Sequence, residues 1–224
     1  SYDGLTGTRL ITNNTGTGST YNGMYISGKI VGTSAWSGDN SLYYWWAAGS
    51  SVSSGASLVI DAGAVVKIYN TVTVSGALDV NGTAQSPVVF TSVNDGEGRT
   101  PAAGDWAWIN INSGGSANFD HAQIRYGGDL NTEGMINASS GSSLTVTNST
   151  LQYADFYAIM SDADAPLITG NTISDCGQYG IYILETSYNT TPVSPEIRDN
   201  VINNTSQAMH FHTSYDGLTG VVLY

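Results

Sequence analysis

The chain has 224 residues and a formal net charge of −12, with only 6 Lys and Arg against 18 Asp and Glu. Binding to nucleic acid phosphates needs clustered cations, so this composition excludes a nucleic acid partner. It has no apolar run of about 18 residues, so no membrane-spanning segment is expected. With 27 Gly and few charged residues, the balance favours turns and strands over helices.

The segment SYDGLTG occurs at residues 1–7 and again at residues 214–220. Apolar residues follow both copies at matching offsets, whereas the residues between them differ. This is typical of a diverged tandem repeat, so the chain is expected to be one period, of about 213 residues, of a longer array. The residues expected to join successive units are Ser1, Tyr2, Leu5, Leu10, Leu218, Val222, Leu223 and Tyr224.

This repeat divides the chain into four parts of one continuous solenoid. Residues 1–27 are expected to end the preceding repeat phase, and residues 28–56 to form a lead-in segment. Residues 57–213 then form the body, and residues 214–224 begin the next phase. Within the lead-in, the aromatic cluster 43–46 (YYWW) is expected to cover part of the core or a lateral joint.

From Ser57 onward, short apolar alternations are broken by Gly, Asn, Asp and Pro. Pairs of apolar residues recur in which four residues separate the two members. The first members of successive pairs are 27, 22, 29 and 21 residues apart, a step typical of solenoids. The pairs are Phe119/Ile124, Val146/Leu151, Ile168/Ile173, Ile197/Ile202 and Leu218/Leu223.

The interior of each step has the two-residue period of a strand, as in Ile181/Ile183 and Met209/Phe211. Because no helical pattern separates the strands, the sequence predicts an all-β solenoid of about eight to nine coils with parallel strands. One segment, 151–160, lacks Gly and Pro and could instead form a short helix. Cys176 is the only cysteine and is expected to point inward as a small apolar group.

Small polar residues recur three positions after the first member of three apolar pairs. Such residues, and those preceding them, suit tight bends, including bends with positive φ. Stacked from coil to coil, inward side chains could hydrogen-bond along the axis, so their predicted role is architectural. They are Ser149, Asn171 and Asn200, preceded by Asn148, Gly170 and Asp199.

Three stretches, Ser57–Tyr69, Gly82–Trp106 and Ile168–Ile183, resemble secreted bacterial right-handed parallel β-helix repeat proteins of the pectate-lyase-like superfamily. The resemblance implies a right-handed parallel β-helix in an extracellular or cell-surface location. It does not fix an activity, because the superfamily includes lyases, hydrolases, adhesins and structural proteins.

Two acidic pairs are candidate cation sites, Asp162 with Asp164 and Asp95 with Glu97. Their oxygens would suit Ca²⁺, although neither pair completes a calcium loop and acidic turns without metal are the simpler interpretation. No other cofactor is expected.

Two further groups are candidates for binding. Arg198 beside Asp199, with His210 and His212 one strand later, is the best basic cluster, and two His at alternate strand positions share a face that could bind metal. Aligning the coils places Tyr25, Met160, Tyr182 and His210 in one outward column. Such a column could stack on glycans, contact another subunit or stabilise the sheet.

Asn-x-Ser/Thr triplets mark possible glycosylation sites at Asn13, Asn81, Asn137, Asn148, Asn189, Asn203 and Asn204.

The sequence favours a non-catalytic extracellular module that assembles with copies of itself, either as a covalent tandem array or as a homopolymer. A surface fibre, filament or sheath would fit this role. One alternative is a glycan-binding or adhesive module that uses Tyr25, Tyr182 and His210. A second is a polysaccharide lyase or hydrolase, for which Arg198 would be essential.

Overall fold

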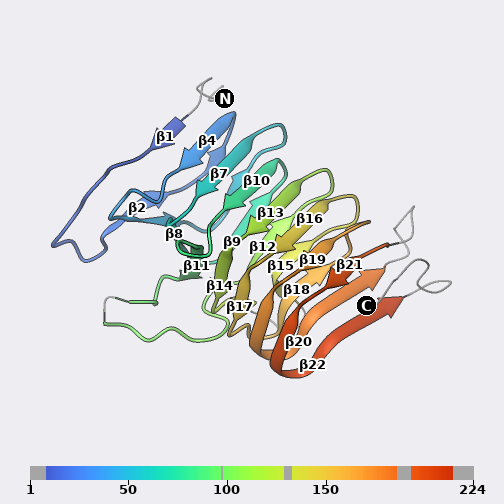
Figure 1. Cartoon of the computed structure of the whole chain (residues 1–224). Coiled ribbons are helices and arrows are strands. Elements are labelled where there is room, and N and C mark those ends of the chain that lie inside the picture. Colours follow the sequence, from blue (N-terminus) through green and yellow to red (C-terminus); the bar gives the residue numbers. More distant parts are fainter. Residues whose placement is uncertain (1–8, 97, 129–132, 186–192, 214–224) are drawn as a thin grey trace.

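The structure, a computed structural model, describes residues 9–96, 98–128, 133–185 and 193–213. These residues form strands and turns without a helix, so none of them belongs to a helix that could cross a membrane. The strands stack into a solenoid in which each turn adds one strand to each of three faces (Figure 1). All strand pairs named below are parallel.

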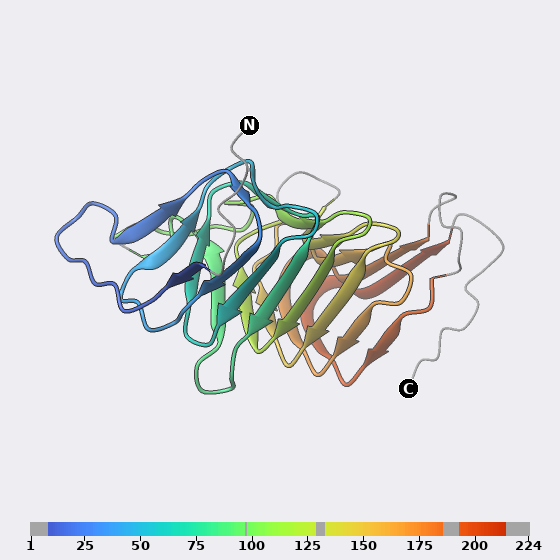
Figure 2. The ribbon, with the colours of Figure 1, turned by 90° about the horizontal axis from the view of Figure 1, so that it is seen from above.

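Face A is the eight-stranded sheet. Figure 2 shows its strands running side by side along the solenoid. In spatial order they are β1 (Arg9–Ile11), β4 (Thr33–Trp36), β7 (Ser57–Asp61), β10 (Ala77–Asn81), β13 (Ser116–Asp120), β16 (Ser143–Thr147), β19 (Leu167–Thr169) and β21 (Glu196–Arg198).

Faces B and C form one 14-stranded sheet that bends at β20 (Thr172–Glu185) and β22 (Val201–Thr213), which contribute to both faces. The other strands of face B are β2 (Gly23–Ile26), β5 (Tyr43–Trp46), β8 (Val65–Ile68), β11 (Val88–Ser92), β14 (Ala122–Arg125) and β17 (Thr150–Gln152). Those of face C are β3 (Lys29–Ile30), β6 (Ser50–Val52), β9 (Thr71–Val74), β12 (Trp108–Ile111), β15 (Gly134–Ala138) and β18 (Tyr157–Ser161).

The predicted apolar pairs form two axial columns inside the solenoid. Their first members, from Phe119 to Ile197, are register partners along face A, and their second members, from Ile124 to Ile202, are register partners along face B. The alternating pairs Ile181/Ile183 and Met209/Phe211 extend the core along face C. The sequence pattern therefore gave the correct register for four of the five pairs; the fifth, Leu218/Leu223, lies outside the described residues.

Each face carries a core column from the first described turn to the last. These columns run from Ile11 to Ile197 on face A, from Met24 to Ile202 on face B and from Ile30 to Phe211 on face C. Their middle members are fully buried. The apolar residues that are only partly buried against the core lie in the end turns and are Ile11, Met24, Ile26, Ile202, Met209 and Phe211.

The turn between faces A and B contains the predicted polar ladder. Ser149 and Asn171 are buried, and Ser149 N donates to Asn171 Oδ1 at 2.9 Å. The preceding residues Asn148, Gly170 and Asp199 have φ of 51°, 69° and 58°, as expected of residues that tolerate the left-handed region. The architectural role predicted for this turn is confirmed.

The structure corrects one expectation and settles one alternative. The eight strands of face A span about seven turns of the solenoid, rather than the eight to nine coils expected. Residues 151–160 contain parts of strands β17 and β18 rather than a short helix, because Leu151 and Ile159 continue core columns of the neighbouring turns. Leu10 lies on face A, where its backbone is in register with Ala35. The 28–56 segment contributes strands β3 to β6.

Candidate functional site

An outward column on face C joins polar to aromatic residues. Asn110, Asn137, Met160, Tyr182 and His210 are successive register partners on β12, β15, β18, β20 and β22. The predicted alignment of the last three is confirmed. Since adjacent strands are about 4.8 Å apart, the column spans about 19 Å along the axis.

Tyr25 does not belong to this column. It lies on β2 in face B, where its register partner is Trp45, and it is 65% exposed. The expectation that Tyr25 aligns with Tyr182 is wrong, because Tyr25 precedes the corner of its turn whereas Tyr182 follows the corner. Tyr25 and Tyr21 instead pack edge-on against Trp45, with ring centroids 5.6 and 4.8 Å away.

Around Tyr182 the side chains form what we call the face C aromatic cluster. Tyr157 stacks on Tyr179 with ring centroids 5.0 Å apart and an interplanar angle of 4°, and Tyr179 stacks on His210 at 4.8 Å. Tyr182 lies 5.0 Å from Tyr157 and 5.2 Å from His210. The cluster consists of Phe156, Tyr157, Tyr179, Tyr182, His210 and His212.

Burial raises the pKa of two phenols in this cluster. Burial raises the pKa of Tyr157 to about 12, with further contributions from Tyr182 and Tyr179. Burial also raises the pKa of Tyr182 above its ordinary value of 10.0. Tyr157 and Tyr182 therefore present uncharged phenol rings whose O–H groups can donate hydrogen bonds.

Beside the cluster, a groove of about 230 Å³ crosses face C. Two carboxylates, Glu133 and Asp162, line it, and burial raises the pKa of Glu133 above 4.5. No Lys or Arg is among the described residues that line it, and this lining is acidic. Its lining residues are Asn110, Glu133, Asn137, Ala138, Ser139, Met160, Asp162 and Leu184.

Asn137 is the unusual member of this lining. Its side chain is only 5% exposed, and its Oδ1 accepts a hydrogen bond from Gly134 N at 2.8 Å. Its Nδ2 is buried and has no hydrogen-bond partner. An unsatisfied buried donor costs free energy, so Asn137 offers a hydrogen bond that an acceptor bound in the groove could complete.

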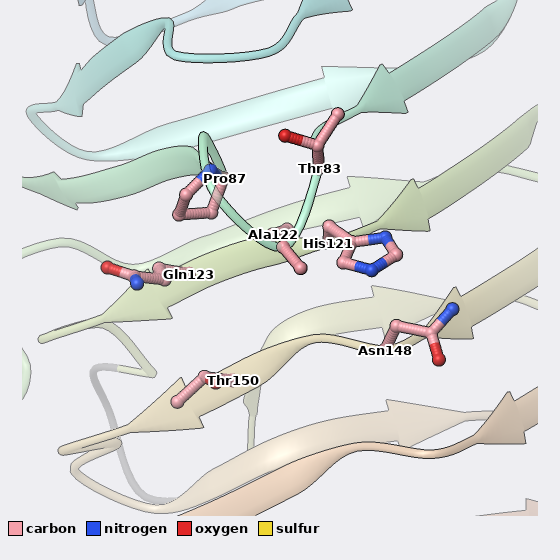
Figure 3. A pocket seen from close by; sticks show the side chains of 8 residues that line it. Thr83, Pro87, His121, Ala122, Gln123, Asn148 and Thr150 are labelled. Carbon is pink, nitrogen blue, oxygen red and sulfur yellow. The ribbon is translucent and has the colours of Figure 1, made fainter.

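A second, smaller pocket of about 100 Å³ lies between the β10–β11 connection and the starts of β14 and β17 (Figure 3). Thr83 and Pro87 face His121 and Asn148 across it. His121 Nδ1 lies 3.0 Å from Asp120 Oδ1, without hydrogen-bond geometry. Asp120 Oδ1 also accepts from Asn148 Nδ2 at 2.9 Å, so these polar groups largely satisfy one another.

The two predicted acidic pairs lie in different turns, with Asp95 after β11 and Asp162 and Asp164 after β18. Asp95 Oδ2 accepts hydrogen bonds from Thr91 Oγ1 at 2.6 Å and from Arg125 Nε at 3.0 Å. Arg125 Nη2 lies 2.8 Å from the same oxygen, so Asp95 is neutralised by an ion pair. Asp162 lines the face C groove, and Asp164 Oδ1 accepts from Gly141 N at 3.4 Å. Glu97 lies outside the described residues. Within the described ranges, no three His, Cys, Asp or Glu side chains are grouped to hold a metal ion.

The predicted basic cluster is also divided between faces. Arg198 ends β21 on face A, where Nε lies 2.7 Å from Glu196 Oε1 and Nη1 lies 3.0 Å from Asp199 Oδ2. His210 and His212 lie on the face C half of β22. The joint site that the sequence proposed is wrong, because the two segments lie on different faces.

The possible glycosylation sites differ in exposure. Asn13, Asn81, Asn148, Asn203 and Asn204 are exposed. Asn137 lines the face C groove and is buried, contrary to the expectation that it could be glycosylated. Asn189 lies outside the described residues. So do Ser1, Tyr2, Leu5, Leu218, Val222, Leu223 and Tyr224 of the predicted assembly interface, and only the backbone of Leu10 is described.

Sequence reasoning missed Glu133, Asn137 as a groove residue, Tyr157 and Tyr179. Tyr157 begins β18 just before its apolar residues, and aligning Gly134 with Tyr157 could have placed it beside the column. Tyr179 was harder to place, because the register of β20 and β22 shifts between Cys176 and Tyr179 at the bend.

The stacked parallel strands, three axial columns and polar turn ladder define a β-helix. Residues 106–220 match the family described as "Right handed beta helix region", and residues 30–142 match the "Pectate-lyase like beta helix domain". Each match covers half of the chain or more, so the chain belongs to the right-handed, pectate-lyase-like β-helix proteins. No curated protein matches the chain, and no solved structure matches it.

Proposed function

We propose that the chain is a non-catalytic, extracellular structural module that stacks end to end with copies of itself. The main support is that several core residues of the end turns are only partly buried. Met24 and Ile202 end the face B column and are only partly buried, as is Phe211 on face C. An apolar residue placed over each would continue the column and remove more apolar surface from water.

The sequence repeat would bring the first strand of a following unit to the position that comes next after β21 on face A. Successive face A strands begin 20 to 39 residues apart. The 213-residue period maps Arg9 of β1 onto position 222, which is 26 residues after Glu196 of β21. This interval lies within the range of 20 to 39 residues between successive face A strands. The first strand of a following unit could therefore pair with β21 as the next strand of face A. In the proposed join, Met24 of the next copy lies over Ile202 and Ile30 lies over Phe211.

A chain in which residues 1–213 are followed by residues 1–224 tests this proposal. Small-angle scattering should give one straight rod, longer than the single chain by about 40 Å, because one period adds eight rungs of about 4.8 Å. Phe211→Asp in the first copy should break the rod at the join, whereas Thr145→Asp on the outer side of face A should not. Two bodies joined by a flexible segment would overturn the proposal.

A second candidate, glycan binding, is favoured by the face C column. The aromatic cluster offers ring faces that can stack on sugar rings, and Asn137 Nδ2 offers a donor in the adjoining groove. The acidic lining disfavours uronates, so neutral or amino sugars are the proposed ligands. A rung advances about 4.8 Å, close to the length of one sugar residue, so a glycan could lie along the column.

Tyr182 and Tyr25 provide a matched pair for testing this candidate. Tyr182→Ala should weaken binding of neutral oligosaccharides on a glycan array, whereas Tyr25→Ala, on face B, should not. Equal losses, or stronger binding of oligouronates than of neutral oligosaccharides, would contradict glycan binding by face C. The rod measurement is independent of this result.

A further inference from the structure

His210 and His212 form a pair of imidazoles on the outer side of β22. They are alternate residues of one strand and therefore project from the same side of the sheet. Their ring centroids are 6.2 Å apart and their planes differ by 18°. His212 is exposed and His210 is half-buried, so solvent can reach the pair.

Two tyrosines restrict the orientation of these rings. Tyr179 stacks on His210 at a centroid distance of 4.8 Å and an interplanar angle of 19°. Tyr182 meets both imidazoles edge-on, with centroids 5.2 Å from His210 and 6.4 Å from His212. Side chains already restricted before binding lose less conformational entropy when a ligand binds.

We propose that His210 and His212 chelate one divalent transition metal ion, with Cu²⁺ preferred over Ni²⁺ and Zn²⁺. Each imidazole would supply one nitrogen, and water would complete the coordination. Imidazole suits these ions, and the affinity of a given set of ligands is highest for Cu²⁺, which also accepts a planar set of nitrogen and oxygen donors. Ca²⁺ would not compete, since it requires oxygen ligands.

The proposal predicts a defined pH dependence. Metal binding requires neutral imidazoles, so acidification should release the ion. The phenols of Tyr179 and Tyr182 contact the pair, and burial raises the pKa of Tyr182 above 10.0.

Titration of the whole chain with CuCl₂ in a non-chelating buffer tests the site, with calorimetry giving the stoichiometry and affinity. Quenching of tyrosine emission gives an independent signal, because Tyr179 and Tyr182 contact the pair. We expect one equivalent to bind. His212→Ala should weaken binding by about tenfold or more, a scale reached even by outer-shell partners of a metal.

Two variants complete the test. His210→Gln should also lose the site, and His121→Ala, which changes the remaining histidine between β13 and β14, should retain it. Circular dichroism checks that each variant folds. Absence of binding by the unmodified chain, or equal affinity in the unmodified chain and His212→Ala, would overturn the proposal. So would an equal loss in His121→Ala.

Discussion

The side-chain amide of Asn171 donates a hydrogen bond to Oδ1 of Asn200, 2.9 Å away, and so joins two successive turns. The same Nδ2 donates to Val146 O at 2.8 Å, and Asn171 Oδ1 accepts from Ser149 N. Asn200 Nδ2 in turn donates to Ile168 O at 2.9 Å. One amide therefore satisfies groups in the turn before it and in the turn after it, at a corner where the backbone leaves face A.

Replacing Asn171 by Ala should destabilise the solenoid by about 2–4 kcal/mol, because Val146 O and Ser149 N would each lose a buried partner. Urea unfolding monitored by circular dichroism measures this change. Asn118→Ala, on the outer side of β13, is the control and should change the free energy of unfolding little. Similar losses in both variants would show that the ladder is not a principal source of stability.

The backbone at Asn148 gives a second prediction. Its φ of 51° suits glycine, and its amide donates to Asp120. Asn148→Gly and Asn148→Ala both remove the amide, but only Ala retains a Cβ in the left-handed region. Asn148→Ala should therefore be less stable than Asn148→Gly by about 1 kcal/mol in the same unfolding measurement. The reverse order would be inconsistent with this turn geometry.

Cys176 should be inert in the folded protein. Burial raises the pKa of its thiol to about 12, so almost no thiolate is present at pH 8. A chromogenic disulfide reagent should label the unfolded chain rapidly and the native chain only as fast as it opens. Rapid labelling without denaturant would mean that the Cys176 turn opens readily.

Glu133 and Asp120 should change stability with pH in opposite directions. Burial raises the folded pKa of Glu133 above 4.5, so its ionisation opposes folding as pH rises through that pKa. Glu133→Gln should therefore be more stable than the unmodified chain at pH 7, and this advantage should disappear below about pH 4.5. Unfolding curves from pH 3 to pH 7 measure the difference.

Asp120 provides the opposite case. Burial raises its pKa, but hydrogen bonds from Asn148 and Thr147 and the contact with His121 outweigh burial, so the folded pKa lies below 3.8. The carboxylate therefore stabilises the fold above pH 3.8, and this contribution is lost as pH falls through the folded pKa. Asp120→Asn should be less stable than the unmodified chain at pH 7, with the difference shrinking in acid. A difference that does not change with pH would contradict the assignment.

The fold was largely predictable because its core obeys two local rules. Apolar pairs such as Val146/Leu151 repeat once per turn, and the polar residues between them mark the corner. The regular spacing of the pairs gave the strand register directly. The lead-in was less predictable, since Trp36, Tyr44 and Trp46 replace the aliphatic residues that fill the core elsewhere.

The candidate sites were less predictable because they depend on corners where the number of residues varies. Tyr25 and Tyr182 both precede an Ile on an alternating strand, yet they occupy different faces. The acidic pair at Asp95 resembled a cation site, but its partner Arg125 is 30 positions away in the sequence. Such pairings become visible only once the coils are stacked.

The corner between faces B and C differs in length from turn to turn. Between β11 and β12 the chain makes a long excursion, whereas β20 and β22 pass this corner without a break, and yet the columns on either side keep their register. Insertions here leave the rungs undisturbed. The rim of face C can therefore change in length while the spiral beneath it stays constant.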